Sequence, residues 1–399
     1  MNVIVMLEHR FLQTPDKGVW TQTMFAHSFW QRYLEVFDRV KVVARIHEVP
    51  TPPSNWKRAD GEGISFVAVP YYVGPQQYLL RAQQVKRAVR NALTASDAVI
   101  LRVSSQLASD LYPVLVQTQH PYGVEVVADP YDVFAPCSIK HPLRRFFRWW
   151  FPRLLRQICA DACAAAYVTE HALQQRYPPA QETFSTHYSS VELANEAFVP
   201  VPRSLGQGMQ PLILITVGTM EQLYKALDVL INAVAACVSG GLDLKLVLVG
   251  DGKYREELEA LAAKLGLGER VCFLGQLTVG DAVRAQLDRA DLFVLPSHQE
   301  GLPRAMIEAM ARGLPCIGST VGGIPELLPP EDMVPPGDVA ALAQKIHEVV
   351  TAPERMTRMS ARNLEKAKEY AEEVLRQRRI AFYRYVRDQT SEWLTTQKL

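Results

Sequence analysis

The stretch with the densest structural signals is Asp291–Glu326, which reads DLFVLPSHQEGLPRAMIEAMARGLPCIGSTVGGIPE. Its apolar start predicts a buried strand that ends at Pro296–Ser297, and a short loop then brings in Glu300. A helix is expected from about Pro303, because proline suits the first helical turn, and it should stop at Gly313, a residue type that often follows helices. This order, a strand, a loop, a helix and a further apolar run, is typical of an α/β domain with a parallel sheet.

The rest of the second half alternates strands and helices in the same way. Its short runs are apolar almost throughout, as expected for strands that are buried on both faces of a parallel sheet. The expected strands are Leu212–Val217, Leu244–Val249, Val271–Leu274, Leu292–Leu295 and Pro315–Ile317, and the expected helices are Leu223–Val238, Tyr254–Leu265 and Asp281–Arg289. This alternation predicts a doubly wound, Rossmann-like domain.

The first half repeats this plan less regularly. The expected strands are Val3–Leu7, Val40–Ile46, Ile64–Val69, Ala98–Val103, Val124–Ala128 and Ala165–Val168, and the expected helices are Thr21–Phe37, Gln76–Leu93 and Pro142–Ala160. The sequence therefore predicts an α/β protein of two Rossmann-like, doubly wound domains that face a cleft.

The boundary between these domains is expected in Phe198–Pro211, which is rich in proline and glycine and has no helical or strand period. The expected bounds are 1–200 for the first domain and 201–377 for the second. A long charged helix from about Pro353 to Trp393 should end the sequence, and its last part, about 378–399, is expected to pack back on the first domain.

Composition excludes some classes of function. The 399 residues include 43 Lys and Arg against 42 Asp and Glu, a net charge of +1, which argues against a general nucleic-acid binder. The six cysteines form no C-x-x-C pair and no zinc-spaced cluster, which favours a reducing, intracellular setting. No signal peptide and no membrane-spanning run are recognisable, so a cytoplasmic protein is expected.

Two glutamates in the opening stretch point to a binding site. Glu300 should stand before the helix, at the carboxyl end of the strand, and Glu308 should lie just over one turn inside the helix. The backbone N–H groups of Gly301 and its neighbours are expected at the positive end of the helix dipole, which suits a phosphate or a sugar hydroxyl.

These residues resemble those of a known enzyme family. Glu300 and Glu308 are similar to the E-x7-E motif of retaining glycosyltransferases of the GT-B fold, in family GT4. The surrounding segments EGLP, EAMARGLP and GGIPE agree with it, as do VGDG at Val249–Gly252, ADLFVLPS at Ala290–Ser297 and PPGD at Pro335–Asp338. The resemblance is strong over about Pro211–Val350 and only general in the first half.

The resemblance implies specific roles on the donor side. Glu300 would contact hydroxyls of the donor sugar, Glu308 would contact the nucleotide ribose, and the amides of Gly301, Leu302 and Pro303 would help to hold the sugar and diphosphate.

In the family a Gly-Arg or Gly-Ser pair and a later lysine also bind the diphosphate. Here the pair is Gly218–Thr219 and the lysine is Lys225. Thr219 replaces the frequent arginine, a departure for which Arg304 could compensate. Gly250 and Gly252 either shape a turn or contact the donor.

The implied donor is a nucleotide-diphosphate sugar, with UDP or GDP favoured. No Asp-x-Asp motif occurs in the chain, and GT-B enzymes use protein cations and helix dipoles at the diphosphate, so no metal or other cofactor is expected.

Two candidates lie on the acceptor side. The family has a glycine-rich loop after its first strand, and Gly18, in Asp16–Trp20, is the partial match; a tight turn without ligand contact is the alternative. Asp129 stands where many members have a histidine. It would accept a proton from the acceptor or bind its hydroxyls, and the alternative is a structural aspartate that caps the next turn.

Lys140–Arg156 reads KHPLRRFFRWWFPRLLR and is basic, aromatic and without acids. Such a stretch is typical of a helix at an anionic membrane surface, here the inner face of the membrane. Packing of its aromatic side chains into the first domain is the alternative.

The expected function is transfer of a sugar to a sugar, lipid-linked or small-molecule acceptor, in polysaccharide or glycolipid synthesis and without nucleic acid as a partner. The alternatives are an epimerase or phosphorylase of the same fold and a non-catalytic sugar-binding protein.

Overall fold

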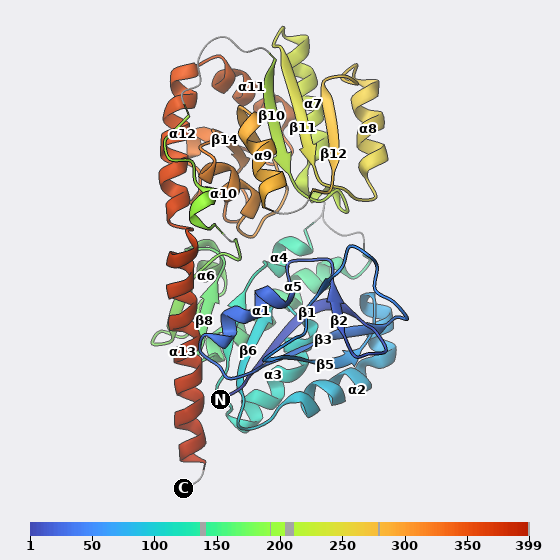
Figure 1. Ribbon diagram of the computed structural model, residues 1–399, viewed down its shortest axis with the longest axis vertical. Coiled ribbons are helices and arrows are strands. Elements are labelled where there is room, and N and C mark those ends of the chain that lie inside the picture. The colour runs from blue at the N-terminus through green and yellow to red at the C-terminus, as the bar shows by residue number, and fades with distance from the viewer. Residues whose placement is uncertain (136–140, 192, 204–210, 278–279, 398–399) are drawn as a thin grey trace. The chain divides into compact units, whose positions relative to one another are not determined.

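The computed structural model describes residues 1–135, 141–191, 193–203, 211–277 and 280–397, which form two compact units (Figure 1). The first unit contains Met1–Pro130, Trp149–Tyr188 and Arg376–Leu399; the second contains Tyr131–Arg148 and Ser189–Leu375. Each unit has its own parallel sheet with helices, so the predicted α/β fold with two Rossmann-like domains is confirmed.

The second unit contains a six-stranded sheet in which all pairs are parallel, in the order β12-β11-β10-β13-β14-β15. Its strands are β10 (Leu212–Val217), β11 (Leu244–Val249), β12 (Val271–Gly275), β13 (Leu292–Leu295), β14 (Cys316–Ser319) and β15 (Met333–Val334). The chain leaves β10 in one direction along the sheet and returns at β13 in the other. Ligands of doubly wound sheets bind at the carboxyl ends of the strands at such a switch point.

The helical elements of the second unit are η2 (Leu223–Lys225), α7 (Leu227–Ser239), α8 (Arg255–Lys264), α9 (Asp281–Arg289), α10 (Arg304–Ala311), α11 (Val339–Val350) and α12 (Pro353–Lys368). Their apolar faces close one core with the sheet, in which Leu230 and Leu246 are completely buried. Ala226 has a φ of 51° and separates η2 from α7, so the single helix predicted from Leu223 begins instead at Leu227.

The first unit is built on a nine-stranded sheet with the path β4-β2-β1-β6-β7-β8-β9, while β3 pairs with β1 and β5 with β3. Its strands are β1 (Val3–Gln13), β2 (Val19–Thr21), β3 (Val40–Glu48), β4 (Lys57–Arg58), β5 (Ile64–Pro70), β6 (Ala98–Val103), β7 (Gly123–Val126), β8 (Ala164–Tyr167) and β9 (Phe184–His187). Strand β1 is longer than predicted, because its residues beyond Leu7 continue into an antiparallel hairpin with β2.

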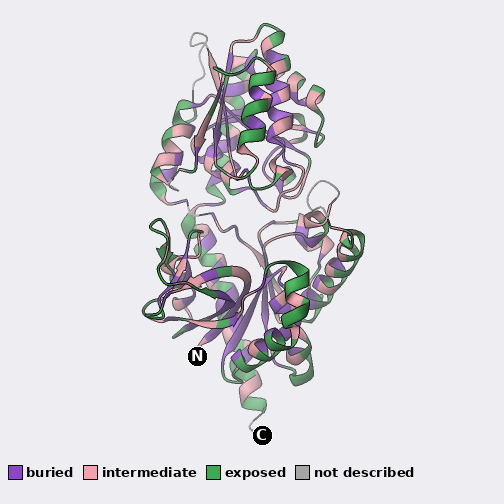
Figure 2. Ribbon diagram, turned by 90° about the vertical axis from the view of Figure 1, so that its right-hand side faces the viewer, coloured by how far each residue is buried: buried purple, intermediate pink, exposed green. Residues whose placement is uncertain are grey.

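Helices cover both faces of this sheet; they are α1 (His27–Leu34), α2 (Gly74–Ala92), α3 (Gln106–Thr118), α6 (Ala172–Arg176) and parts of α5 (Arg144–Asp161) and α13 (Glu372–Thr396), whereas α4 (Pro130–Val133) belongs to the second unit from Tyr131 onward. One apolar core joins α2, α3 and α5 to the side chains of Ile4 and Met6, which point to the same face. On the other face α1 and α13 stack through Tyr33 and Tyr383, whose ring centroids are 4.6 Å apart. Figure 2 shows the strands mainly buried and the outer sides of the helices exposed.

A buried carboxylate ties α13 to the first unit. Glu125 on β7 forms an ion pair with Arg102 on β6 and accepts hydrogen bonds from Tyr33, Tyr188 and Tyr383 at 3.0, 2.7 and 3.2 Å. Burial opposes ionisation, but Arg102 and the tyrosine hydroxyls hold the pKa of Glu125 below its usual value. The carboxylate therefore links α1, β6, β7 and α13.

The predicted helix from Pro353 to Trp393 is wrong, because it is two helices. The turn Glu369–Ala371 separates α12 from α13, and the backbone N–H of Glu372 donates to the carbonyl of Leu193 at 2.9 Å. Likewise, α1 begins only at His27, because Thr21 belongs to the hairpin strand β2.

The predicted linker is largely part of the second unit. The N–H of Val199 donates to the carbonyl of Ala311 at 3.0 Å, and the Arg203 guanidinium donates to the carbonyls of Ala290 and Arg312 at 2.6 and 2.7 Å. The remaining linker residues, 204–210, lie outside the described part of the chain.

Candidate functional site

Two of the predicted donor-side residues meet at the switch point of the second sheet. Lys225 follows β10 and ends η2, and Glu300 lies in the loop after β13, the neighbouring strand. The Lys225 Nζ donates to Glu300 Oε1 at 2.6 Å, and their side chains are only 12% and 8% exposed. The pair places a cation and a carboxylate at the edge of the sheet where ligands of this fold bind.

Close contacts fix the position of the Glu300 loop. Ser297 Oγ donates to the same Glu300 oxygen at 2.7 Å, and the N–H of Gly323 donates to the carbonyl of Gly301 at 2.7 Å. A Cβ atom on Gly322 would lie 1.9 Å from the carbonyl oxygen of Glu300, and the φ of Gly322 is +53°. Only glycine fits there, because any side chain would push the loop away from the strand end.

The N-terminus of α10 follows this loop and offers hydrogen-bond donors. Pro303 is the N-cap and Arg304 the exposed first residue of the helix, as the sequence predicted. The N–H groups of Gly301 and Leu302 donate to no atom in the described part of the chain. Together with the helix dipole they suit an anionic or hydroxylated ligand beside Glu300 and Lys225.

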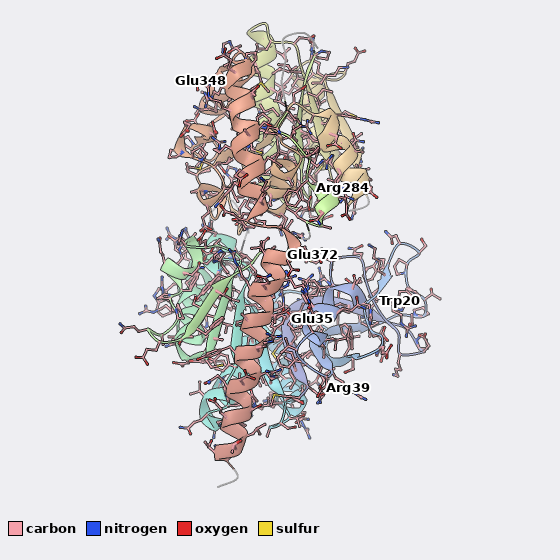
Figure 3. The ribbon with its side chains drawn as sticks, turned by 60° about the vertical axis from the view of Figure 1, so that its left-hand side comes forward. Trp20, Glu35, Arg39, Arg284, Glu348 and Glu372 are labelled. Carbon is pink, nitrogen blue, oxygen red and sulfur yellow. The ribbon has the colours of Figure 1, made fainter. Side chains whose placement is uncertain are left out.

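Glu308 lies in the middle of α10 and is partly buried. Burial raises the pKa of its carboxyl, and the positive charges of Arg304 and Arg284 oppose this rise. Arg284 belongs to α9 of the same unit and is labelled in Figure 3. A desolvated carboxylate gains free energy when a ligand hydroxyl donates to it, so Glu308 is suited to bind a polar group.

Gly218 and Thr219 lie in the loop after β10. This loop packs directly on the loop after β11: the N–H of Gly218 donates to the carbonyl of Val249 at 2.9 Å. A Cβ on Gly250 would lie 1.8 Å from the Gly218 oxygen, and one on Gly252 would lie 2.2 Å from the Glu221 nitrogen. Gly250 and Gly252 therefore serve the close approach of the two loops. Thr219 Oγ1 accepts the N–H of Glu221 at 3.1 Å.

The acceptor-side candidates both belong to the first unit. Gly18 lies at the tip of the hairpin between β1 and β2, where its carbonyl accepts the N–H of Thr14 at 3.0 Å and its N–H donates to Asp16 at 3.3 Å. The neighbouring Lys17 has a φ of 65°. Gly18 thus forms a tight turn, and its contact with a ligand stays a prediction.

Asp129 lies after β7 and is buried. Its carboxylate forms an ion pair with Arg176 and accepts a hydrogen bond from the hydroxyl of Tyr177. These contacts attach Asp129 to the segment around α6, a structural role other than the predicted capping of the next turn, and its role toward an acceptor stays a prediction.

Arg144–Arg156 of the basic aromatic stretch belongs to α5, residues 141–143 precede the helix, and Lys140 lies outside the described residues. Pro152 and Leu155 of this helix are buried, whereas Trp149 and Trp150 are 52% and 46% exposed, and contact with a membrane stays a prediction. In the described part of the chain, no helix has the length and apolarity required to cross a membrane. The described His, Cys, Asp and Glu residues form no group of three or more that could hold a metal ion.

Sequence reasoning did not single out Ser297 and Gly322 as site residues. The S-x-x-E spacing after a buried strand was the available signal for Ser297. For Gly322 the GG pair in GSTVGGIPE indicated a turn, but not that the turn contacts Glu300.

Residues 211–352 match the family described as glycosyl transferases group 1. The chain is 26% identical to Protein CapJ of Staphylococcus aureus over 87% of this chain and 86% of CapJ. It is 33% identical to the putative colanic acid biosynthesis glycosyltransferase WcaL of Escherichia coli over 36% of this chain and 37% of WcaL.

Solved structures share the fold at low sequence identity. Sucrose-phosphate synthase from Thermosynechococcus elongatus has a TM-score of 0.72 at 17% identity, covering 98% of this chain and all of that one. Anabaena Alr3699/HepE, solved in complex with UDP-glucose, has a TM-score of 0.62 at 17% identity over 99% of this chain and all of that one. Residues 211–352 therefore match the group 1 glycosyltransferases, the whole chain has the GT-B fold, and it is a glycosyltransferase.

Proposed function

We propose that this glycosyltransferase transfers a hexosyl group from a nucleotide-diphosphate sugar to a hydroxyl acceptor with retention of the anomeric configuration. The observation that carries the proposal is the contact of Lys225 with Glu300 beside the N–H groups of Gly301 and Leu302. It combines a cation for a diphosphate, a carboxylate for sugar hydroxyls, and backbone donors at a helix N-terminus.

Each donor-side residue has a proposed role. Lys225 neutralises the charge that the diphosphate gains as the bond from the sugar C1 to the phosphate oxygen breaks. Arg304, exposed at the start of α10, supplies the second cation that Thr219 lacks. Glu300 fixes the sugar, and Glu308 binds the ribose. No metal is needed in this scheme, because Lys225, Arg304 and the helix dipole supply the positive charge.

The proposed transfer takes place on one face of the sugar. The acceptor oxygen bonds to C1 on the face from which the diphosphate departs, and the acceptor proton passes to the departing phosphate oxygen. Asp129 of the first unit is proposed to bind acceptor hydroxyls. Asp129→Asn should raise the KM for the acceptor, whereas a merely structural aspartate would instead lower thermal stability and leave that KM unchanged.

The donor is proposed to carry UDP or GDP, and HepE, whose fold this chain shares, was solved with UDP-glucose. The acceptor is proposed to belong to polysaccharide or glycolipid synthesis, since WcaL is named for colanic acid biosynthesis. We place the protein in the cytoplasm, with α5 in peripheral contact with the inner face of the membrane. The exposure of Trp149 and Trp150 supports this contact.

A donor panel tests the proposal. UDP-, GDP- and ADP-sugars are incubated with the protein, and slow hydrolysis of one donor is expected without any acceptor and in the presence of excess EDTA. When a hydroxyl acceptor is added, NMR of the glycoside that forms should show the anomeric configuration of the donor. Release of a C2 epimer would indicate an epimerase, and the absence of turnover with every donor would contradict the proposal.

A further inference from the structure

Two adjacent leucines on α2 are the most exposed large apolar side chains in the described part of the chain. Leu79 is 72% and Leu80 is 87% exposed. Single exposed apolar side chains are common on protein surfaces. Two adjacent exposed leucines on one helix, however, lack the free energy that burial of their side chains would provide. Something that covers both side chains would recover it.

The same outer face of α2 carries positive charge. Leu79, Lys86 and Arg90 follow one another at helical spacings of seven and four residues, and Arg87 lies seven residues after Leu80. The opposite face of the helix is fixed in the core by Val85 and Val89, which are completely buried. The leucines and the basic residues therefore point away from the unit together.

Helix α5 repeats this arrangement. Trp149 and Trp150 are exposed in its second turn, Arg153 and Arg156 follow on the same face, and Leu155 is buried on the opposite one. The Arg153 guanidinium lies 4.9 Å from the centre of the Trp149 ring. Both helices thus present a large apolar pair near the N-terminus and basic side chains further along.

The fold aligns these two helices. Helices α2 and α5 pack into the same core on one face of the sheet, with α3 between them. Each connects two parallel strands, so both run in the same direction, and their apolar pairs lie toward the same end of the unit. At about 10 Å between neighbouring helices, the two pairs are about 20 Å apart.

The face formed by α2, α3 and α5 carries mainly positive charge. Helix α2 has four basic residues and the part of α5 in the first unit has two, Arg153 and Arg156, whereas the acids of the three helices are Asp110 and Asp161 alone. Tyr78 donates to Asp110 at 2.8 Å, and Tyr112 donates to Asp161. The face is therefore complementary to an extended anionic surface.

We infer that α2 is a second membrane-contacting element, whose Leu79–Leu80 pair enters the headgroup region of an anionic bilayer while Lys86, Arg87 and Arg90 bind lipid phosphates. This inference rests on the proposed membrane contact of α5 and adds α2 as a second anchor. Aliphatic side chains favour lipid over single-stranded nucleic acid, because they offer no flat ring for base stacking. Two anchors hold the unit in one orientation on the bilayer, which a single anchor does not.

Vesicle flotation of the full chain tests this inference. Wild-type protein should float with phosphatidylcholine vesicles that contain about one-third phosphatidylglycerol and should stay behind with pure phosphatidylcholine. Leu79→Gln/Leu80→Gln keeps every charge and should lower the partition coefficient about tenfold or more. Lys86→Gln/Arg87→Gln/Arg90→Gln should lower it similarly and weaken its salt dependence, of which the arginines of α5 keep a part. Val201→Gln is the matched control, since Val201 is 64% exposed in the second unit, and it should bind like wild type.

Further variants separate this inference from the proposals on which it rests. Trp149→Gln/Trp150→Gln tests the α5 contact alone, and Glu300→Ala should lose turnover but float normally. Each variant is also checked by its melting temperature. Normal flotation of the leucine variant would overturn the α2 inference and leave the α5 contact intact. No flotation of wild type, or equal binding to single-stranded DNA, would overturn both contacts without bearing on donor turnover.

Discussion

Lys225 and Glu300 neutralise each other across 2.6 Å at the end of two neighbouring strands. Lys225→Ala removes the charge that stabilises a departing diphosphate, and Glu300→Ala removes the group that fixes the sugar. Each variant should lower kcat by about 10²–10³. The measurement is donor turnover at saturating donor and acceptor.

Lys264→Ala is the matched control, because Lys264 is an exposed lysine in the last turn of α8. Both site variants should also melt below wild type, because each leaves one partner of a largely buried ion pair uncompensated, so turnover is compared at a temperature at which every variant is folded. Wild-type kcat in Lys225→Ala would remove the lysine from the proposed mechanism.

Glu308 should make stability depend on pH. Burial raises the pKa of its carboxyl in the folded chain, so the protonated form is favoured there. Its contribution to the free energy of unfolding is therefore fully present below the unfolded pKa of about 4.3 and is lost as pH rises through the higher folded pKa. Glu308→Gln should melt at a higher temperature than wild type at neutral pH, and the difference should shrink toward about pH 4.

The same variant should raise the KM for the donor about tenfold, because the amide binds ribose hydroxyls less strongly than a carboxylate does. A neutral-pH melting temperature below that of wild type would show instead that contacts of the Glu308 carboxylate stabilise the fold.

At the scale of elements, the position of the loop before α10 depends on Gly322, which packs against this loop. Gly322→Ala would place a methyl group 1.9 Å from the carbonyl oxygen of Glu300 and should displace this residue from Lys225. Turnover should fall at least about a hundredfold. Gly266→Ala is the matched control: Gly266 has a φ of +72° with no atom within 4 Å of the added Cβ, so it should cost about 1 kcal/mol of stability and no turnover. Equal activities of the two variants would contradict this geometry.

The strands of the second unit were predictable because burial on both faces leaves continuous apolar runs, and β10, β11 and β13 have the expected bounds. The hairpin of β1 and β2 was not, since its residues mix polar and apolar types and its pairing depends on the turn at Thr14–Gly18. The break between α12 and α13 was equally hidden, because the carbonyl that receives the N–H of Glu372 belongs to Leu193, far away in sequence.

In the candidate site, too, local features were predictable, whereas contacts between segments distant in sequence were not. The positions of Glu300 and Lys225 after their strands were predictable from local motifs. Their mutual contact depends on β10 and β13 being neighbours, which no local pattern encodes. The partners of Asp129 likewise come from the segment around α6, more than forty residues later, so the sequence left its role open.

At the scale of the whole molecule, the end of the chain completes the first unit. A Cβ on Gly123 would lie 2.6 Å from Val386 and 2.8 Å from Phe382, so α13 packs directly on β7. Tyr383 also donates to the buried Glu125, and Arg376 donates to Glu35 at 2.7 Å, with Glu35 labelled in Figure 3. Residues 376–397 therefore belong to the unit that begins at Met1, and Phe382, Tyr383 and Val386 contribute to its core.

Changes in this contact should unfold the first unit before the second. Glu125→Ala leaves Arg102 as an uncompensated buried charge and should cost about 3–5 kcal/mol. Tyr383→Phe removes one hydrogen bond and should cost about 1 kcal/mol. Arg384→Ala is the matched control, because Arg384 is the exposed neighbour of Tyr383. Hydrogen exchange resolved by peptide measures each unit separately.

In Glu125→Ala, exchange should accelerate in β6, β7 and α1, while β10 and β13 stay protected as in wild type. The first unit should also lose stability in acid, because the depressed pKa of Glu125 contributes stability that is present above the unfolded pKa of about 4.3 and lost as pH falls through the folded value. In Glu125→Gln this acid-dependent loss should be smaller. If exchange instead accelerated equally in both sheets, the two units would unfold together. That result would contradict the claim that α13 stabilises the first unit alone.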